Sequence, residues 1–244
     1  MTREPGFSPH EIEWTRERSS RLWDYLSSNR SYESTYFSWR SGNSLLRFLR
    51  RRNLLRAGKT LDFGCGPGFF LEMLLRRGIG CQGVDFSESS VRRARDRVGQ
   101  HPLSGPVVLA QGLPLPLESD TFDTAFLLET VEHLLPEDLE ATVAEVRRLI
   151  RPGKHLVVTT PNEEDLDAAK ILCPECGCIF HRTQHVRSWS AASLSKYMED
   201  RGFARVMCTS ATLTERSLRS YVVTAWNAVA RSRKPNLIYV GKKA

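Results

Sequence analysis

The sequence predicts an α/β fold with a mostly parallel sheet, because segments suited to strands and segments suited to helices alternate along most of the chain. The chain has 244 residues, 41% of them hydrophobic, which suits one domain with a sizeable core. A glycine-rich turn, LDFGCGPGFF at 61–70, joins the first expected strand to the first helix after it. We expect strands near 59–63, 80–85, 106–110, 121–128 and 154–160, and helices near 68–77, 87–98 and 136–150.

The remaining elements follow from periodicity and from punctuating residues. Pro136 suits the first position of its helix, and Pro152-Gly153 separates that helix from the next strand. A further helix is expected over 190–203, closed by Gly202. Strands near 204–210 and 236–241 bring the sheet to seven, and the segment between them, 216–234, suits an amphipathic or buried helix.

Residues 1–57 form a separate N-terminal region, rich in aromatic residues, that we interpret as a helical cap. Leu45, Leu46 and Leu49 supply a plausible apolar face. Two interpretations stay open: the aromatic side chains pack on the core, or they form a lid over a binding crevice. Residues 58–244 then make up the main domain, with an insertion at about 165–189.

The glycine turn suits a nucleotide-type pocket at the carboxyl end of the sheet. Asp62 ends the first strand, and Gly64, Gly66 and Gly68 follow at alternate positions. Glycines let the backbone reverse sharply and approach a ligand closely. A second acid, Asp85, ends the next strand, where a carboxylate can accept hydrogen bonds from both ribose hydroxyls. An ordinary strand-to-helix turn is the alternative interpretation.

With GCGPG and Asp85, the chain resembles the class I S-adenosylmethionine-dependent methyltransferases. The resemblance continues through LPLPLESDTFDTAFLLETVEHL (113–134) and RPGKHLVVTTPN (151–162). It implies a Rossmann-like, seven-stranded, mostly parallel sheet with helices on both faces and an antiparallel last strand. The glycine turn would wrap the methionine end of S-adenosyl-L-methionine, and Asp85 would hold its ribose.

The resemblance also implies the other cofactor contacts. Leu109 stands where this branch often has an Asp for the adenine, so we expect Ala110 and Gln111 to read the base. The predicted cofactor-binding residues are Asp62, Gly64, Cys65, Gly66, Gly68, Asp85, Phe86, Ala110, Gln111, Gly112 and Leu128.

The predicted catalytic residues are Glu129, Glu132 and His133, in ETVEH after an apolar run. At positions i, i+3 and i+4 they would share one face of a helical turn. The motif resembles that of ubiquinone-biosynthesis O-methyltransferases and small-RNA terminal 2′-O-methyltransferases, which use it with a divalent metal; the RNA enzymes add a histidine, for which His185 is the candidate. Either these residues hold Mg²⁺ beside an acceptor hydroxyl, or His133 acts as the base without metal.

A second constellation, CPECGCIFHRTQH, predicts a structural zinc site in the insertion. Cys173, Cys176, His181 and His185 have the spacing C-x2-C-x4-H-x3-H, and Cys178 is a substitute ligand. Redox chemistry at C-x-x-C is the alternative. The zinc site and the E-x-x-E-H motif compete for His185, which we assign to the zinc.

These observations predict an S-adenosylmethionine-dependent methyltransferase acting on a small or medium hydroxylated metabolite, a sugar or a lipid-linked intermediate. An RNA 2′-hydroxyl is the second candidate, favoured by the net charge of +7, although arginine richness also reflects base composition. A non-catalytic cofactor-binding partner protein is the third. We find no apolar run near the ~20 residues of a membrane span and no signal segment, so we expect a cytoplasmic protein without disulfides. The oligomeric state stays open.

Overall fold

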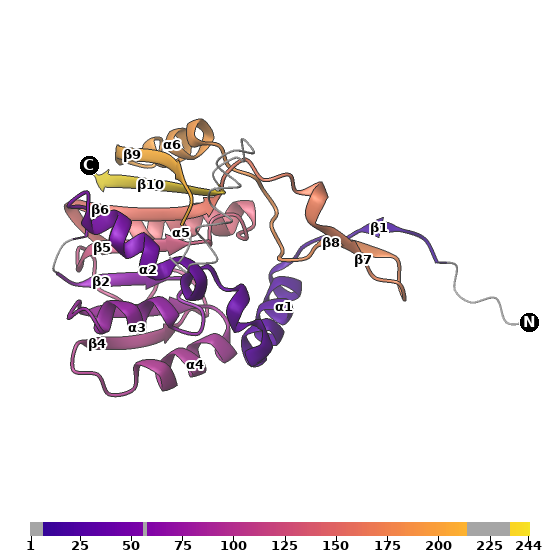
Figure 1. Ribbon diagram of the computed structural model, residues 1–244, viewed down its shortest axis with the longest axis horizontal. Helices are drawn as coiled ribbons and strands as arrows, with labels where there is room; N and C mark the ends of the chain where they lie inside the picture. The colour runs from indigo at the N-terminus through magenta and orange to yellow at the C-terminus, as the bar shows by residue number, and fades with distance from the viewer. Residues whose placement is uncertain (1–6, 56–57, 214–234) are drawn as a thin grey trace, which may run out of the picture.

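A seven-stranded sheet forms the body of the protein in a computed structural model that describes residues 7–55, 58–213 and 235–244 (Figure 1). The strand order is β4-β3-β2-β5-β6-β10-β9. Its strands are β2 (Thr60–Phe63), β3 (Cys81–Asp85), β4 (Ser104–Leu109), β5 (Phe122–Leu128), β6 (Ile150–Pro161), β9 (Phe203–Ala211) and β10 (Asn236–Lys243). Strand β10 pairs antiparallel with both β6 and β9, whereas the pairs among β2 to β6 are parallel. The predicted sheet and its antiparallel last strand are confirmed.

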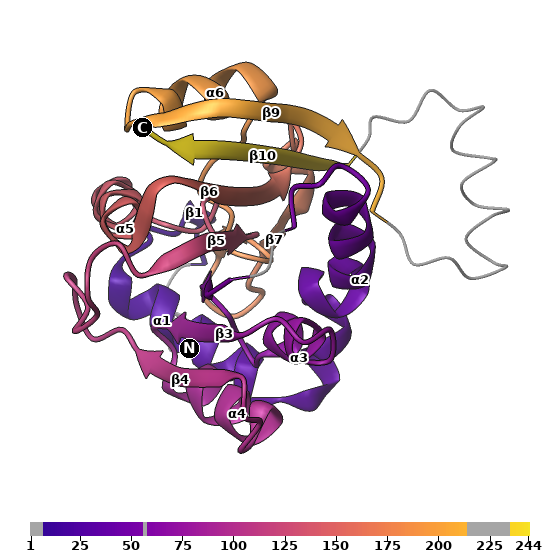
Figure 2. The same cartoon turned by 90° about the vertical axis from the view of Figure 1, so that its left-hand side faces the viewer.

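The central strands are apolar on both faces because helices cover both sides of the sheet (Figure 2). In β5, Ala125 and Leu127 join one core cluster and Phe126 and Leu128 join the other. Helices α2 (Phe37–Arg50), α3 (Phe69–Leu75) and α4 (Glu88–Val98) supply side chains to the second cluster. Helices α5 (Pro136–Leu149) and α6 (Ala191–Glu199) supply the first.

The predicted boundaries differ from the observed ones mainly around β6. This strand starts at Ile150 rather than near 154, and its pairing with β5 shifts register between Phe122 and Thr124. The irregularity accommodates Pro152 and Gly153, whose φ is +75°. Helix α6 ends at Glu199, and a turn at Gly202 leads into β9. The helix expected over 216–234 lies outside the described residues.

The N-terminal region divides into two parts rather than forming one cap. Helix α2 buries Leu45, Leu46 and Leu49 against the sheet and is therefore one of its covering helices. Helix α1 (Arg16–Ser28) and the 3-10 helix η1 (Arg30–Thr35) lie instead near the edge at which the parallel strands end (Figure 1). Ser27 of α1 hydrogen-bonds Ser90 of α4 at 2.7 Å, which ties α1 to the main domain.

The insertion forms a small second sheet that projects beyond the same edge (Figure 1). The 3-10 helix η2 (Asp167–Ala169) leads into a hairpin of β7 (Lys170–Leu172) and β8 (Cys178–His181). Strand β1 (His10–Glu11) pairs in parallel with β8. The N-terminal segment and the insertion therefore form one projecting arm together. None of the helices in the part of the chain described is both long and apolar enough to cross a membrane.

Candidate active site

The glycine turn after β2 has the backbone geometry that the sequence predicts. Gly64, Gly66 and Gly68 all have positive φ, at +81°, +52° and +81°. A Cβ on Gly68 would lie 3.0 Å from the Cα of Ala94, and one on Gly66 would lie 3.2 Å from the ring of Tyr36. Side chains are therefore excluded both by backbone strain and by the neighbouring α4 and Tyr36.

Asp85 ties this turn to the end of β3. Its Oδ2 accepts a hydrogen bond from the backbone N–H of Gly66 at 2.8 Å, and its Oδ1 accepts one from Ser87 at 2.9 Å. Burial raises the pKa of Asp85 to about 6, while the backbone donors of Ser87 and Gly66 act in the opposite direction. Asp62 is also buried, and burial together with nearby Asp85 raises its pKa to about 8.

The other predicted cofactor residues lie at the carboxyl ends of β2 to β5. Cys65 is buried under the turn, and its N–H donates to Val84 O at 3.0 Å. Ala110 follows β4 and donates its N–H to Asp85 O at 2.8 Å, and Gln111 and Gly112 are exposed beside it. Phe86 is 42% exposed, whereas Leu128 is buried at the end of β5. The set therefore lines one edge of the sheet, the place at which doubly wound folds bind ligands.

The ETVEH segment follows β5 as an irregular turn rather than a helix. Glu129 has a φ of +48°, and its N–H donates to Thr159 O at 2.9 Å. Burial raises the pKa of Glu129 to about 7. Glu132 is 1% exposed, and neither of its carboxylate oxygens has a hydrogen-bond partner. Burial and then the charge of Glu129 raise its pKa well above the usual range.

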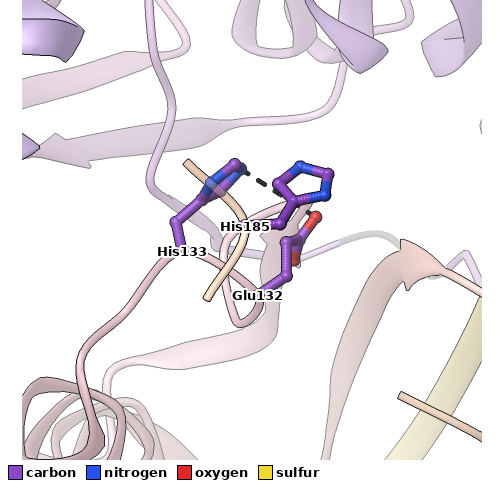
Figure 3. Close-up of side chains that lie close together, drawn as sticks. All are labelled: Glu132, His133 and His185. Atoms are coloured by element: carbon purple, nitrogen blue, oxygen red, sulfur yellow. Dashed lines mark ion pairs between the residues drawn. The ribbon is translucent and has the colours of Figure 1, made fainter. Parts of the chain in front are cut away.

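His133 and His185 lie against each other beside Glu132 (Figure 3). Their ring centroids are 4.7 Å apart, and His133 Nε2 lies 4.0 Å from Glu132 Oε1. The carbonyl of Gln184 lies 3.4 Å from His133 Nδ1, so Nδ1 carries the proton and Nε2 the lone pair. Burial first, and then the neighbouring His185, lower the pKa of His133 to about 3, which keeps the ring neutral.

The structure does not assemble the predicted four-ligand zinc site. Cys173 and Cys176 lie at the turn of the β7–β8 hairpin, where Gly177 has a φ of +76°. His181 is the last residue of β8 and packs on His185 instead, with ring centroids 4.5 Å apart. A strand rises about 3.3 Å per residue, so β8 carries His181 away from the cysteine turn. The prediction that assigned His185 to the cysteines is wrong for this geometry.

Two close groups of ligand-type residues occur instead among the described residues. One is Glu132, His133 and His185, and the other is Glu164, His181 and His185; within each, the ligand atoms all lie within 4.8 Å of one another. Neither group contains a cysteine. The structure thus joins the E-x-x-E-H motif to His185.

Sequence reasoning missed Glu164 and Gln184. Glu164 comes three residues after the end of β6, the strand that pairs with β5, and that position beside the strand before the ETVEH motif was an available signal. Gln184 is 1% exposed; its Nε2 donates to His133 O at 2.8 Å and its Oε1 accepts from Trp23 Nε1 at 2.7 Å. No pattern in the sequence connects Trp23 to Gln184, because the two residues are joined only by the tertiary fold.

A seven-stranded sheet of this order, with a glycine turn and an acid at the ends of β2 and β3, defines the class I S-adenosylmethionine-dependent methyltransferases. The comparisons agree: residues 18–207 match the methyltransferase domain family, and the chain belongs to that family. The chain thus carries a methyltransferase domain of the S-adenosylmethionine-dependent class.

Relatives of known name match part of the chain. The methyltransferase GfsG of Streptomyces halstedii is 33% identical over 122 residues, which are 48% of this chain and 43% of that protein. A ubiquinone biosynthesis O-methyltransferase of Coxiella burnetii is 29% identical over 117 residues, covering 48% of this chain and 49% of the relative. The chain thus spans about half the length of these relatives.

Solved structures share the fold over most of the chain. A Haloferax volcanii methyltransferase in complex with the Trm112 activator has a TM-score of 0.67 and 18% identity, with 90% of this chain and 96% of that one covered. The 1,6-didemethyltoxoflavin-N1-methyltransferase of Burkholderia thailandensis, with S-adenosylhomocysteine bound, has a TM-score of 0.65 and 16% identity, with 97% and 94% covered.

Proposed function

We propose that this methyltransferase transfers the methyl group to an acceptor hydroxyl held beside Glu132, His133 and His185. The observation that carries the proposal is the pair of adjoining imidazoles next to a buried carboxylate, both of whose oxygens lack a partner. His133 has its lone pair on Nε2 and can accept a hydroxyl proton there. Burial lowers the pKa of this ring to about 3, so the ring alone is a weak base, and the transfer relies on the negative charge of Glu132 beside Nε2 to stabilise the imidazolium.

The transfer is a displacement at the methyl carbon of the sulfonium. The acceptor oxygen forms a bond to that carbon, the carbon–sulfur bond breaks with its electrons going to sulfur, and the hydroxyl proton passes to His133 Nε2. The cofactor supplies the activated leaving group, so the protein mainly orients the reactants and accepts the proton. Asp85 would hold the ribose, and the turn at Gly64, Gly66 and Gly68 would leave room for the methionine end.

A divalent metal at the same residues is the second form of this proposal. The partnerless oxygens of Glu132 and the ligand atoms of His133 and His185 fit one ion. Two imidazoles with a carboxylate suit a borderline transition metal better than Mg²⁺, for which the set Glu129, Glu132 and His133 was predicted. When bound, such an ion polarises the acceptor hydroxyl and makes it easier to deprotonate.

The acceptor we favour is a small or medium hydroxylated metabolite, a sugar or a lipid-linked intermediate. Among the relatives, the names 27-O-demethylrifamycin SV methyltransferase and ubiquinone biosynthesis O-methyltransferase support transfer to oxygen. An RNA 2′-hydroxyl is second, supported by the net charge of +7 and by the contact of His185 with His133. The third alternative is a non-catalytic cofactor-binding partner. It is disfavoured because the buried carboxyl groups of Glu129 and Glu132 lie beside His133, where a protein without catalysis would not need them.

Three further expectations remain proposals. The segment from α1 through η1 to Tyr36 acts as a lid. This is supported by Tyr36, whose ring lies over Gly66, and by Trp23 of α1, whose ring centroid lies 4.8 Å from that of His133. The thiols of Cys173 and Cys176 hold zinc without the histidines, supported by the tight turn at Gly177 and by backbone N–H groups that lower the pKa of Cys173. The location is cytoplasmic.

Incubation with isotopically labelled cofactor and fractionated cell extract tests the proposal. Label is expected in an ether-linked methyl group of a small metabolite, a glycan or a lipid-linked fraction. Label in the ribose of RNA would instead identify the acceptor as an RNA 2′-hydroxyl and overturn the small-metabolite, sugar or lipid-linked acceptor. Label on nitrogen or carbon alone would overturn O-methylation, and retention of cofactor without transfer to any fraction would support the non-catalytic alternative.

A further inference from the structure

Glu164 lies beside two histidines, His185 and His181. Its Oε2 contacts His185 Nδ1 at very short range, and its Oε1 lies 3.6 Å from His181 Nε2. The three residues come from separate places: the segment after β6, the end of β8, and the loop before α6. Glu164 keeps only 23% of its side-chain surface exposed, and His185 keeps 11%.

His181 faces Glu164 with a protonated nitrogen. Its Nδ1 accepts the backbone N–H of His185 at 3.1 Å and that of Thr183 at 3.3 Å, so Nδ1 must hold a lone pair. The proton of a neutral ring is then on Nε2, which is buried, makes no hydrogen bond and lies 3.6 Å from Glu164 Oε1. His181 therefore directs an N–H at Glu164 and has no Nε2 lone pair for a metal ion there. The group Glu164, His181 and His185 is better suited to orient a carboxylate than to bind a cation.

The same reasoning fixes the tautomer of His185. An ionised carboxylate only accepts hydrogen bonds, so the ring nitrogen that contacts Glu164 carries the proton. The lone pair of a neutral His185 ring is then on Nε2. His133 is held in the same tautomer by the carbonyl of Gln184. Two adjoining imidazoles thus each have the lone pair on Nε2, and that of His133 lies 4.0 Å from Glu132 Oε1, an oxygen without a hydrogen-bond partner.

We propose that Glu164 is a positioning residue that fixes the orientation and tautomer of His185, with the N–H of His181 3.6 Å from the second carboxylate oxygen. A carboxylate behind a histidine plays this part both in catalytic triads and in carboxylate–histidine–metal sites. The assignment of the tautomer is independent of the methyl-transfer chemistry, whereas its effect on turnover rests on the proposed function.

Glu164→Ala and Glu164→Gln, compared with Glu163→Gln, test the proposal. Glu163 is the exposed neighbour and provides a matched loss of charge. Nitrogen-15 NMR of the histidine rings is expected to show His185 protonated on Nδ1 in the wild type, in Glu163→Gln and in Glu164→Gln, because a glutamine oxygen still accepts that proton. In Glu164→Ala the two tautomers should mix.

Turnover should be measured with the acceptor that the labelling experiment identifies. It should fall 10–100-fold in Glu164→Ala and less in Glu164→Gln, with the cofactor Kd unchanged. A folded Glu164→Ala protein that keeps the single Nδ1–H tautomer would overturn the proposal, as would equal turnover in Glu164→Ala and Glu163→Gln. If the wild-type protein methylates no hydroxyl, the proposed function fails, and the NMR comparison alone still decides the role of Glu164.

Discussion

The end of the site predicted to bind the cofactor (the cofactor end) and the end proposed to bind the acceptor (the acceptor end) are assembled in different ways. The cofactor end is local: the turn between β2 and α3 is bound through Gly66 to Asp85 at the end of the next strand. The acceptor end combines the turn after β5, the segment after β6, the projecting arm and helix α1, through contacts such as His133 with His185 and Trp23 with Gln184. The cofactor end is thus formed by residues that are close together in the sequence. The acceptor end depends instead on tertiary contacts between segments that are far apart in the sequence.

The largest effect is expected from the acceptor end. His133→Ala should lower turnover by about 10²–10⁴-fold, the usual range for a positioned base. Glu132→Ala should have an effect of the same size if a metal ion takes part. The cofactor Kd, measured by calorimetry, should stay near that of the wild type. Full turnover in His133→Ala would leave positioning of the reactants as the whole of catalysis.

A chelator separates the two forms of the mechanism. If a metal ion takes part, removal of divalent ions should abolish turnover and Zn²⁺, Mn²⁺ or Co²⁺ should restore it. If His133 acts without a metal ion, turnover should survive the chelator and Glu132→Ala should have a smaller effect than His133→Ala.

The next effect is expected at the cofactor end. Asp85→Ala removes a carboxylate that would accept charge-assisted bonds from the ribose, worth about 1.5–3 kcal/mol each, so the cofactor Kd should rise at least tenfold. Asp96→Ala, on the exposed face of α4, is the control and should leave the Kd unchanged. Calorimetry that finds wild-type affinity in Asp85→Ala contradicts the ribose assignment.

The cofactor end and the acceptor end also differ in how well the sequence predicts them. The strand and helix pattern, the glycine turn and Asp85 follow from spacing, because consecutive strands of a parallel sheet end at one edge. The predicted set of four zinc ligands treated Cys173 to His185 as one loop, whereas β8 extends between the cysteine turn and His181, so the structure does not bring these four residues together. Glu164 was missed because its partner, His185, comes 21 positions later and reaches it only after the hairpin returns to the sheet.

The pH dependence of cofactor binding should follow Asp85. Burial raises its pKa to about 6, so the carboxylate is ionised above that pH and protonated below it. Ribose hydroxyls donate to the ionised form, and the cofactor Kd should therefore rise as the pH falls below about 6. Folding stability changes in the opposite sense, since ionising a buried acid whose folded pKa is raised costs stability as the pH increases through this range. In Asp85→Asn, calorimetry at several pH values should show weak binding without this step.

The smallest effect separates backbone strain from packing in the glycine turn. Gly68 and Gly78 both have positive φ, at +81° and +72°, but a Cβ on Gly78 would meet nothing within 4 Å. Gly78→Ala should therefore cost about 1–2 kcal/mol of unfolding free energy, from the left-handed backbone alone. In Gly68→Ala the new methyl group would lie 3.0 Å from Ala94, so overpacking against α4 should add about 1–3 kcal/mol. Urea unfolding of both variants measures the difference. Equal losses would mean that α4 shifts without cost, and Gly68 would then be required for its backbone conformation rather than for close packing of helix and turn.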